Sequence, residues 1–165
     1  MVQVHGGVGR NVVEDIANVE LRPTYVSVVD DSGLSDDVVR NLISHKVEVR
    51  YIARSKEGLG TWLAIFDNDG DVIASISRRP DVSAIEGILE KHGDEIFRNA
   101  DSIAIEFDIE VPILKKTLEL AAKYGKEVYT VVSNMGIAME RRDLIRKTSA
   151  LVCNLQEAGM LFYED

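Results

Sequence analysis

Short β-branched runs alternate with amphipathic helical patterns along most of the chain, and this alternation limits the folds that it can adopt. The helical patterns lie at residues 10–19, 35–45, 82–100, 111–126, 139–149 and 156–165, and the β-rich runs lie at residues 24–29, 47–55, 101–108, 127–133 and 150–155. Repetition of strand and helix favours a parallel sheet covered by helices on both faces. We therefore expect an α/β protein with three layers, helix–sheet–helix.

Several residues mark where the predicted helices begin and end. Ser35 is the candidate N-cap of the helix at 35–45, because its hydroxyl is suited to accept a hydrogen bond from a free amide of the first turn. Pro112 stands near the start of the helix at 111–126, and Gly125 stands at its end. These signals predict well-defined boundaries for two of the helices.

One segment departs from the alternation. Asn68-Asp69-Gly70-Asp71 separates two β-rich runs directly, which is typical of a β-hairpin. We expect one domain over residues 1–165, with an excursion at about residues 48–79 that stands off the main body as a flap. Trp62 lies in this excursion, where it is suited to the core, to a lid or to an interface.

The charge balance argues against nucleic acid as a partner. The chain has 28 Asp and Glu residues against 19 Lys and Arg, a formal net charge of -9, so a phosphate backbone would meet no basic stripe. An apolar content of 45% is enough for a hydrophobic core. Neither a basic and apolar leader nor an apolar stretch near 18 residues occurs, so we expect a soluble, cytoplasmic protein with no membrane partner.

Cysteine and histidine give no sign of a metal site. Cys153, the only cysteine, lies in the apolar run ALVCNL, where a small hydrophobic role fits better than a nucleophilic one. His5, His45 and His92 are scattered without ligand spacing, which argues against zinc.

Three glycines stand directly ahead of the first helical pattern, in the stretch GGVGRN at residues 6–11. Glycine lets a backbone bend sharply or lets another group approach it closely. The stretch therefore predicts either a ligand contact or a turn that caps the helix, with Asn11 merely polar in the first turn. It differs from the dinucleotide-binding pattern, because the final glycine is missing and no strand precedes it.

Five stretches occur in an order and spacing that resembles the ribokinase-like (PfkB-type) carbohydrate and nucleoside kinases. They are GGVGRNVVEDIA, VSVVDDSGLSDDVVRNL, VEVRYI, GTWLAIFDNDGDVIASIS and NLQEAGML. Arg10 before Asn11 looks most like the pseudouridine-kinase-like branch of that family. The resemblance implies a partial ribokinase-like fold with an inserted β-hairpin lid over about residues 48–79.

The resemblance also assigns the glycine stretch to substrate binding. It implies that bare backbone approaches a sugar ring at the glycines and that an amide side chain bonds its hydroxyls. The residues so assigned are Gly6, Gly7 and Asn11, with Gly9 and Arg10 as helpers.

Asn154 and Glu157 form a second assigned pair, at the end of a predicted strand. The resemblance implies that they organise Mg²⁺ and the phosphates of ATP, and that Glu157 contributes to the metal site, because a hard cation prefers oxygen ligands. The alternative from the residues alone is structural: Asn154 as a helix N-cap and Glu157 as its capping-box partner.

The hairpin is similar to the lid that closes over the sugar in these kinases and that often forms a homodimer contact. Exclusion of water favours transfer of the phosphoryl group to a hydroxyl. The alternative is an ordinary edge hairpin.

The Gly-Ala-Gly-Asp turn that supplies the catalytic base in this family does not occur in the 165 residues. Only five residues precede Gly6, where the family has its first strand, and Thr130–Ser133 keeps only the end of the family's Asp-Pro-Val-Ser strand. We therefore expect an internal fragment of a kinase, without a catalytic residue of its own. The expected function is ATP-dependent phosphorylation of a sugar or nucleoside hydroxyl, this chain carrying the substrate half; the alternative is a noncatalytic sugar-binding or dimerisation module.

Predictions can also be made for two acidic positions and one charged run. Asp30-Asp31 matches an acidic turn of the family, which we interpret as structural. Asp108 ends a predicted strand and is a candidate to face the substrate. The run RRDLIRK at residues 141–147 is expected to be a solvated helix face, with a phosphate contact as the alternative.

Overall fold

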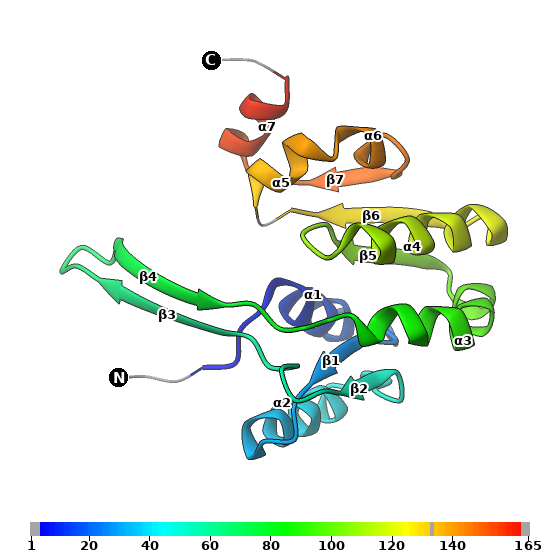
Figure 1. Cartoon of the computed structure of the whole chain (residues 1–165), viewed down its shortest axis with the longest axis horizontal. Helices are drawn as coiled ribbons and strands as arrows, with labels where there is room; N and C mark the ends of the chain where they lie inside the picture. Colours follow the sequence, from blue (N-terminus) through cyan, green and yellow to red (C-terminus); the bar gives the residue numbers. More distant parts are fainter. Residues whose placement is uncertain (1–3, 133, 163–165) are drawn as a thin grey trace. The chain divides into compact units, whose positions relative to one another are not determined.

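A computed structural model describes residues 4–132 and 134–162 of the chain (Figure 1). The chain divides into two compact units. The first holds Asn11–Ile85 together with the residues up to Gly7, and the second holds Val8–Arg10 and the residues from Glu86 onward. Each unit contains a parallel sheet of its own, so each is described in turn.

The first unit is built on a strand–helix–strand crossover. Strand β1 (Ser27–Val29) and strand β2 (Ile52–Arg54) are parallel, with Ser27 opposite Ile52 and Val29 opposite Arg54. Helix α2 (Gly33–Ser44) connects them, as parallel neighbours require a connection that returns to the same end of the sheet. The expected strands at 24–29 and 47–55 are thus confirmed in shorter form, with an isolated bridge between Thr24 and Glu48.

Helix α1 (Val8–Asn18) packs with α2 around the core of this unit. Val13, Leu42 and Val47 form the buried centre, and Leu42 is fully buried. The partly buried side chains packed against them are Ala17, Tyr25, Val38, Val49 and Ile52. The helical residues of this core recur at helical spacing, Val13 with Ala17 in α1 and Val38 with Leu42 in α2.

The expected hairpin is confirmed. Strands β3 (Thr61–Phe66) and β4 (Val72–Arg78) pair antiparallel, and Gly70 in their turn has a φ of 91°. The register changes between Ile65 and Phe66: Ile65 lies opposite Ala74, but Phe66 lies opposite Val72, so β4 has one extra residue there. This irregularity is a β-bulge.

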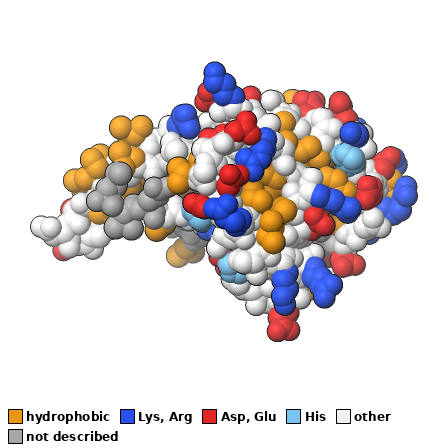
Figure 2. Space-filling model, turned by 90° about the horizontal axis from the view of Figure 1, so that it is seen from below, with side chains coloured by type: hydrophobic (Ala, Val, Ile, Leu, Met, Phe, Trp, Pro, Cys, Tyr) orange, Lys and Arg blue, Asp and Glu red, His pale blue; other side chains and the backbone are white. Residues whose placement is uncertain are grey.

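The hairpin exposes apolar side chains on both of its faces. Opposite residues of an antiparallel pair share a face, so Leu63 and Ile76 lie on one face, and Trp62 lies with Ser77 on the other. Ile76 is 73% exposed and Trp62 is 61% exposed. Figure 2 shows hydrophobic side chains gathered along this ribbon. Exposed patches of this kind are typical of binding surfaces.

The second unit contains a sheet of three parallel strands. Strand β6 (Glu127–Val131) lies between β5 (Ser102–Glu106) and β7 (Ala150–Val152), in the order β5-β6-β7. Helices α3 (Ala84–Asn99) and α4 (Val111–Tyr124) precede and follow β5 along the chain. The core includes Phe107 and Leu114, both fully buried, and Val128 and Thr130 at alternate positions of β6.

The residues that mark helix ends predicted the bounds of α4 correctly but not the N-cap of α2. Gly125 ends α4 in the left-handed region (φ 62°), where a residue without Cβ is favoured, and Pro112 lies in the first turn. The N-cap prediction for Ser35 is wrong. Ser32 caps α2, and its hydroxyl accepts the hydrogen bond from the Ser35 amide, because the helix begins at Gly33.

The helix expected at 139–149 is also different in the structure. Helix α5 (Met135–Glu140) and helix α6 (Arg142–Ile145) replace it, and Arg141 between them has non-helical dihedral angles (φ -115°, ψ 27°). Helix α7 (Leu155–Phe162) begins close to its predicted start. Residues 163–165 of that predicted helix and residue 133 of the predicted strand lie outside the described residues.

Gly58 provides a test of the packing in the first unit. A Cβ atom at this buried glycine would lie 2.4 Å from the carbonyl oxygen of Val29, at the end of β1. Because that obstacle is backbone, we expect Gly58→Ala to lower the free energy of unfolding by about 1–3 kcal/mol in urea denaturation. Gly33→Ala is the matched control, since nothing lies within 4 Å of its added Cβ. Equal stability of the two variants would contradict the packing described here.

Candidate functional site

Helix α1 begins at the glycine stretch. Gly7 is the N-cap residue, with a φ of 96° that glycine adopts readily, and no side chain caps the helix. The backbone amide of Asn11 donates to the Gly7 carbonyl at 2.9 Å. Helix α1 starts at Val8, so Gly9 and Arg10 lie inside its first turn and Asn11 is its fourth residue. Asn11 therefore does not cap the helix.

The glycine at position 6 has a different environment from the one at position 7. Gly6 is exposed, and nothing lies within 4 Å of a Cβ atom built on it. Neither an unusual φ nor a neighbouring atom within the described residues therefore accounts for glycine at this position. Gly6 is thus exposed, as is Asn11 five residues later.

The amide of Gly9 is bound by a carboxylate from a distant part of the chain. Gly9 N donates to Glu106 Oε2 at 3.1 Å, and both residues belong to the second unit. The first turn of α1 contains no acidic residue. Glu106, the last residue of β5, supplies the negative charge that a helix N-terminus favours. The sequence did not indicate Glu106, because the predicted strand runs on to Asp108 and places Glu106 inside it, whereas β5 ends at Glu106.

The loop after β5 is held by an arginine. Arg141 Nη1 donates to the carbonyl oxygens of Phe107 (3.0 Å) and Ile109 (2.5 Å), on either side of Asp108. Arg142 donates to the Leu161 carbonyl in α7. The expectation that the whole run at 141–147 is a solvated face is therefore wrong for these two half-buried residues, whereas Arg146 and Lys147 are exposed.

Asn154 and Glu157 form a reciprocal capping box at the start of α7. The Glu157 amide donates to Asn154 Oδ1 at 2.8 Å, and the Asn154 amide donates to Glu157 Oε2, also at 2.8 Å. This geometry satisfies two amides that the helix leaves free. The two residues follow β7, so they lie beyond the carboxyl end of a parallel strand.

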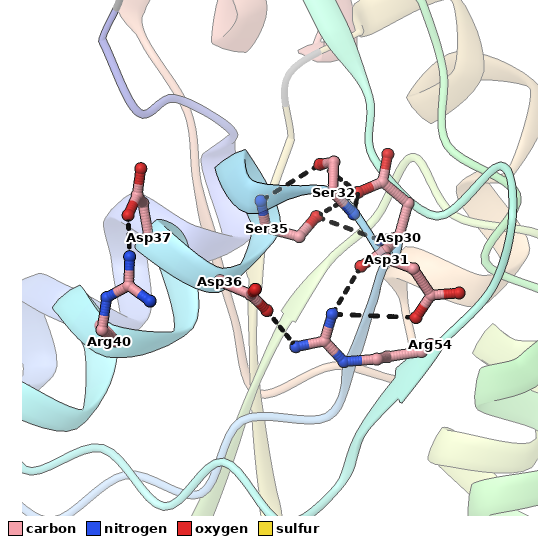
Figure 3. Close-up of polar contacts among 8 residues, drawn as sticks. All are labelled: Asp30, Asp31, Ser32, Ser35, Asp36, Asp37, Arg40 and Arg54. Atoms are coloured by element: carbon pink, nitrogen blue, oxygen red, sulfur yellow. Dashed lines mark hydrogen bonds and ion pairs between the residues drawn. The ribbon is translucent and has the colours of Figure 1, made fainter.

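Asp30, at the carboxyl end of β1, is surrounded by serine donors (Figure 3). Its Oδ1 accepts hydrogen bonds from the Ser32 hydroxyl (2.5 Å), the Ser32 amide (2.9 Å) and the Ser35 hydroxyl (2.6 Å). The Ser32 hydroxyl above all lowers the pKa of Asp30 from its ordinary 3.8 to about 2, and the Ser35 hydroxyl and Ser32 amide contribute further.

Arg54, from the end of β2, completes this cluster. Its Nη1 donates to the Asp30 carbonyl at 2.9 Å, and its Nη2 bonds Asp36 in the first turn of α2 at 2.6 Å. The cluster thereby links β1, α2 and β2 (Figure 3). The polar groups of Asp30, Ser32 and Ser35 bind one another, as expected for a structural turn.

Histidine and cysteine do not form a cluster in the part of the chain that the structure describes. Nδ1 of His45 lies 2.9 Å from the Asn41 carbonyl, and Cys153 is half-buried. Among these described residues, no group of three His, Cys, Asp or Glu side chains is placed to hold a metal ion. Within residues 4–132 and 134–162, no helix is both long enough and apolar enough to cross a membrane.

Comparison with known proteins establishes the family. The model of the pfkB family carbohydrate kinases matches residues 1–165, so the chain belongs to the PfkB family of carbohydrate kinases. Among curated proteins, the guanosine-inosine kinase of Exiguobacterium acetylicum is similar, at 27% identity over 158 residues, which are 95% of this chain and 52% of that protein. The chain thus spans about half the length of the curated relative that it matches.

Solved structures confirm the ribokinase-like α/β fold. The adenosine kinase of Sinorhizobium meliloti superposes with a TM-score of 0.80 at 17% identity, covering 99% of this chain and 53% of that one. The Arabidopsis thaliana ribokinase complexed with ribose and ATP gives a TM-score of 0.74 at 19% identity, covering 94% and 51%. At these identities the similarity is one of fold.

The Asp30 cluster predicts a specific acid response. Because the pKa of Asp30 is lower in the folded protein, its contribution to stability is present above about pH 4 and is lost as the pH falls towards 2. Asp30→Asn should therefore lower stability at neutral pH and flatten the pH dependence of unfolding between these values, measured by urea denaturation. Asp31→Asn, a neighbouring carboxylate that the serines do not bond, should keep the slope. An unchanged slope in Asp30→Asn would contradict this role.

Proposed function

We propose that this chain carries the acceptor-binding part of an ATP-dependent kinase that phosphorylates a hydroxyl group of a sugar or nucleoside. The observation that carries the proposal is Gly6. Its backbone is accessible, and neither its conformation nor a neighbouring atom requires glycine there. A ligand that approaches the backbone closely would explain why this position is glycine.

The proposed acceptor site consists of the glycine turn and the polar residues that follow it. Bare backbone at Gly6 and Gly7 admits the ring, and the side chain of the exposed Asn11 offers one acceptor and two donors to its hydroxyls. Gly9 and Arg10, in the first turn of α1, assist in the same site.

We further propose that Asn154 and Glu157 serve the nucleotide end of the reaction. Both offer oxygen atoms at a helix N-terminus, the donor type that Mg²⁺ prefers, and Mg²⁺ takes its remaining ligands from water and phosphate. Bound Mg²⁺ would neutralise the charge that develops on the transferred phosphoryl group. The capping box would then keep the two side chains oriented before the nucleotide arrives.

Nucleosides are the acceptor class that the relatives favour. Similar proteins include one named guanosine-inosine kinase and one named adenosine kinase, and another was solved with ribose and ATP. We propose a purine nucleoside as the first acceptor to examine. Pseudouridine, which Arg10 ahead of Asn11 favours, is the second.

A noncatalytic role in sugar binding or dimerisation is the alternative, and the exposed apolar side chains of the hairpin favour it. The Gly-Ala-Gly-Asp turn does not occur within these 165 residues. Such a chain would bind an acceptor or another copy without transferring phosphate. Joining the chain to a segment that carries this turn separates the two proposals. Phosphate transfer with the added turn supports the kinase, whereas binding without transfer supports the noncatalytic module.

The hairpin is the proposed lid and dimer contact. Its aliphatic face, with Leu63, Ile65 and Ile76, suits a second copy of the chain, because apolar area is lost from water when two such faces meet. Its other face pairs Trp62 with Ser77, a combination that suits a hydroxylated ligand.

Asn11→Ala tests the acceptor site directly. Loss of hydrogen bonds worth about 0.5–1.5 kcal/mol each should weaken nucleoside binding by about tenfold. Asn11 is exposed, so thermal stability should stay nearly constant. The measurement is calorimetric titration of this chain with guanosine, inosine, adenosine, pseudouridine and ribose. Asn18→Ala, at the exposed far end of the same helix, is the matched control. Binding of none of the five ligands, or equal binding by both variants, would overturn the proposed site.

Ile76→Lys tests the dimer. A charge in the centre of the aliphatic face should convert a concentration-dependent dimer into a monomer in sedimentation experiments, with little effect on stability because Ile76 is largely exposed. Ser77→Lys places the same charge on the opposite face and should leave the dimer intact. A wild-type chain that stays monomeric at all concentrations would rule the contact out.

A further inference from the structure

Asp69 and Gly70 lie in the exposed turn that joins β3 to β4. Asp69 is followed by glycine, and no other aspartate or asparagine of the 165 residues is. Nothing lies within 4 Å of a Cβ atom built on Gly70. A side chain at this position would hinder the approach of the Gly70 nitrogen to the preceding carboxyl group, and glycine has none. The pair thus combines an accessible carboxyl group with an unhindered backbone nitrogen.

The hydrogen bonds of the turn involve Asp67 and leave this pair weakly held. Asp67 Oδ1 accepts the amides of Asp69 (3.0 Å) and Asp71 (2.9 Å), and the Asp67 amide donates to the Asp71 carbonyl at 2.9 Å. The Gly70 amide donates to the Asp67 carbonyl at 3.3 Å, which is longer than an ordinary hydrogen bond. Within the described residues, the Asp69 carboxylate has neither a hydrogen bond nor an ion pair. Little therefore prevents the two groups from meeting.

We propose that Asp69 is a modification site, at which aspartate converts to isoaspartate through a cyclic succinimide and the turn opens as a result. The proposal does not depend on the proposed function. In the first step the Gly70 nitrogen forms a bond to Cγ of the Asp69 carboxylic acid. The hydroxyl group leaves Cγ and departs as water with the proton of the Gly70 amide.

Hydrolysis of the ring decides which residue results. Water adds to one of the two ring carbonyl carbons and breaks its bond to the Gly70 nitrogen. Cleavage at Cγ restores aspartate. Cleavage at the backbone carbonyl carbon leaves the chain running through Cγ, which is isoaspartate with a free α-carboxylate. One water molecule is lost and one is gained, and no group is oxidised or reduced.

Isoaspartate opens the turn because it adds one carbon atom to the backbone between Asp67 and Asp71. The bond from the Asp67 amide to the Asp71 carbonyl closes the turn, and Asp67 Oδ1 holds two further amides. A hairpin turn fits its strands only at defined backbone lengths. The longer backbone therefore breaks hydrogen bonds of the turn, and the Asp71 amide loses protection from exchange with solvent.

Ageing of the wild-type chain tests the proposal. The protein is kept at physiological temperature and pH for several weeks, and peptide mapping with electron-transfer fragmentation then distinguishes isoaspartate from aspartate. Isoaspartate should accumulate at residue 69 and stay at background at Asp71, where the following residue, Val72, is branched at Cβ and hinders the attack. Amide hydrogen exchange at Asp71 should be faster in the isoaspartyl fraction. No isoaspartate at residue 69, equal amounts at both positions, or unchanged exchange would overturn the proposal.

Asp69→Glu removes the reaction and keeps the charge. Glutamate would have to form a larger ring, which closes less readily, so the isomer at residue 69 should be lost. Asp71→Glu is the matched control in the same exposed turn and should leave isomerisation at Asp69 intact. Asp69→Asn should react faster than the wild type, because ammonia leaves the amide more readily than water leaves the acid. Isomer in Asp69→Glu at the wild-type amount, its loss in Asp71→Glu, or no acceleration in Asp69→Asn would contradict attack by the Gly70 nitrogen.

Discussion

Parallel strand pairing is the constraint on which the described structure depends. Parallel neighbours must be connected by a crossover, so each strand ends at the same edge of its sheet and the following residues form a loop there. In the first unit, Asp30 follows β1 and binds the serines that begin α2. In the second unit, Glu106 ends β5 and Asn154 follows β7. Asp30, Glu106 and Asn154 therefore lie where strands end, which is the place where α/β proteins bind ligands.

Much of the fold was predictable, because local signals and burial agree. The hairpin at Asn68–Asp71 was predicted from its turn residues and the β-rich runs on either side, and Gly125 was predicted at the end of α4, where it has a left-handed conformation. The break at Arg141 was not predictable, because the run on either side of it is continuous in helical character. Its guanidinium reaches two carbonyls of a distant loop, a tertiary contact that no local pattern in the sequence reveals.

The candidate site was predicted in part. The glycine stretch was identified from its three closely spaced glycines ahead of a helical pattern, but Glu106, which binds the Gly9 amide, lies 97 residues away and was found only in the structure. Ser32 and Ser35 show a related limit, since both are suitable caps and only the position of the first helical residue decides between them. Asn154 and Glu157 illustrate the reverse case. The capping box that the residues alone predicted is present, and the proposed role towards Mg²⁺ uses the same atoms.

The β-bulge beside Ile65 has a consequence for how this hairpin can change in length during evolution. Because successive side chains of a strand point to opposite faces, inserting one residue within β3 or β4 would exchange the aliphatic face with the face of Trp62 beyond that point. The bulge is an extra residue of this kind in β4, and the pairing shifts there from Ile65 opposite Ala74 to Phe66 opposite Val72. Insertions and deletions should therefore accumulate in the turn at residues 67–71, where they leave both faces in register, and be rare between the bulge and the base of the hairpin.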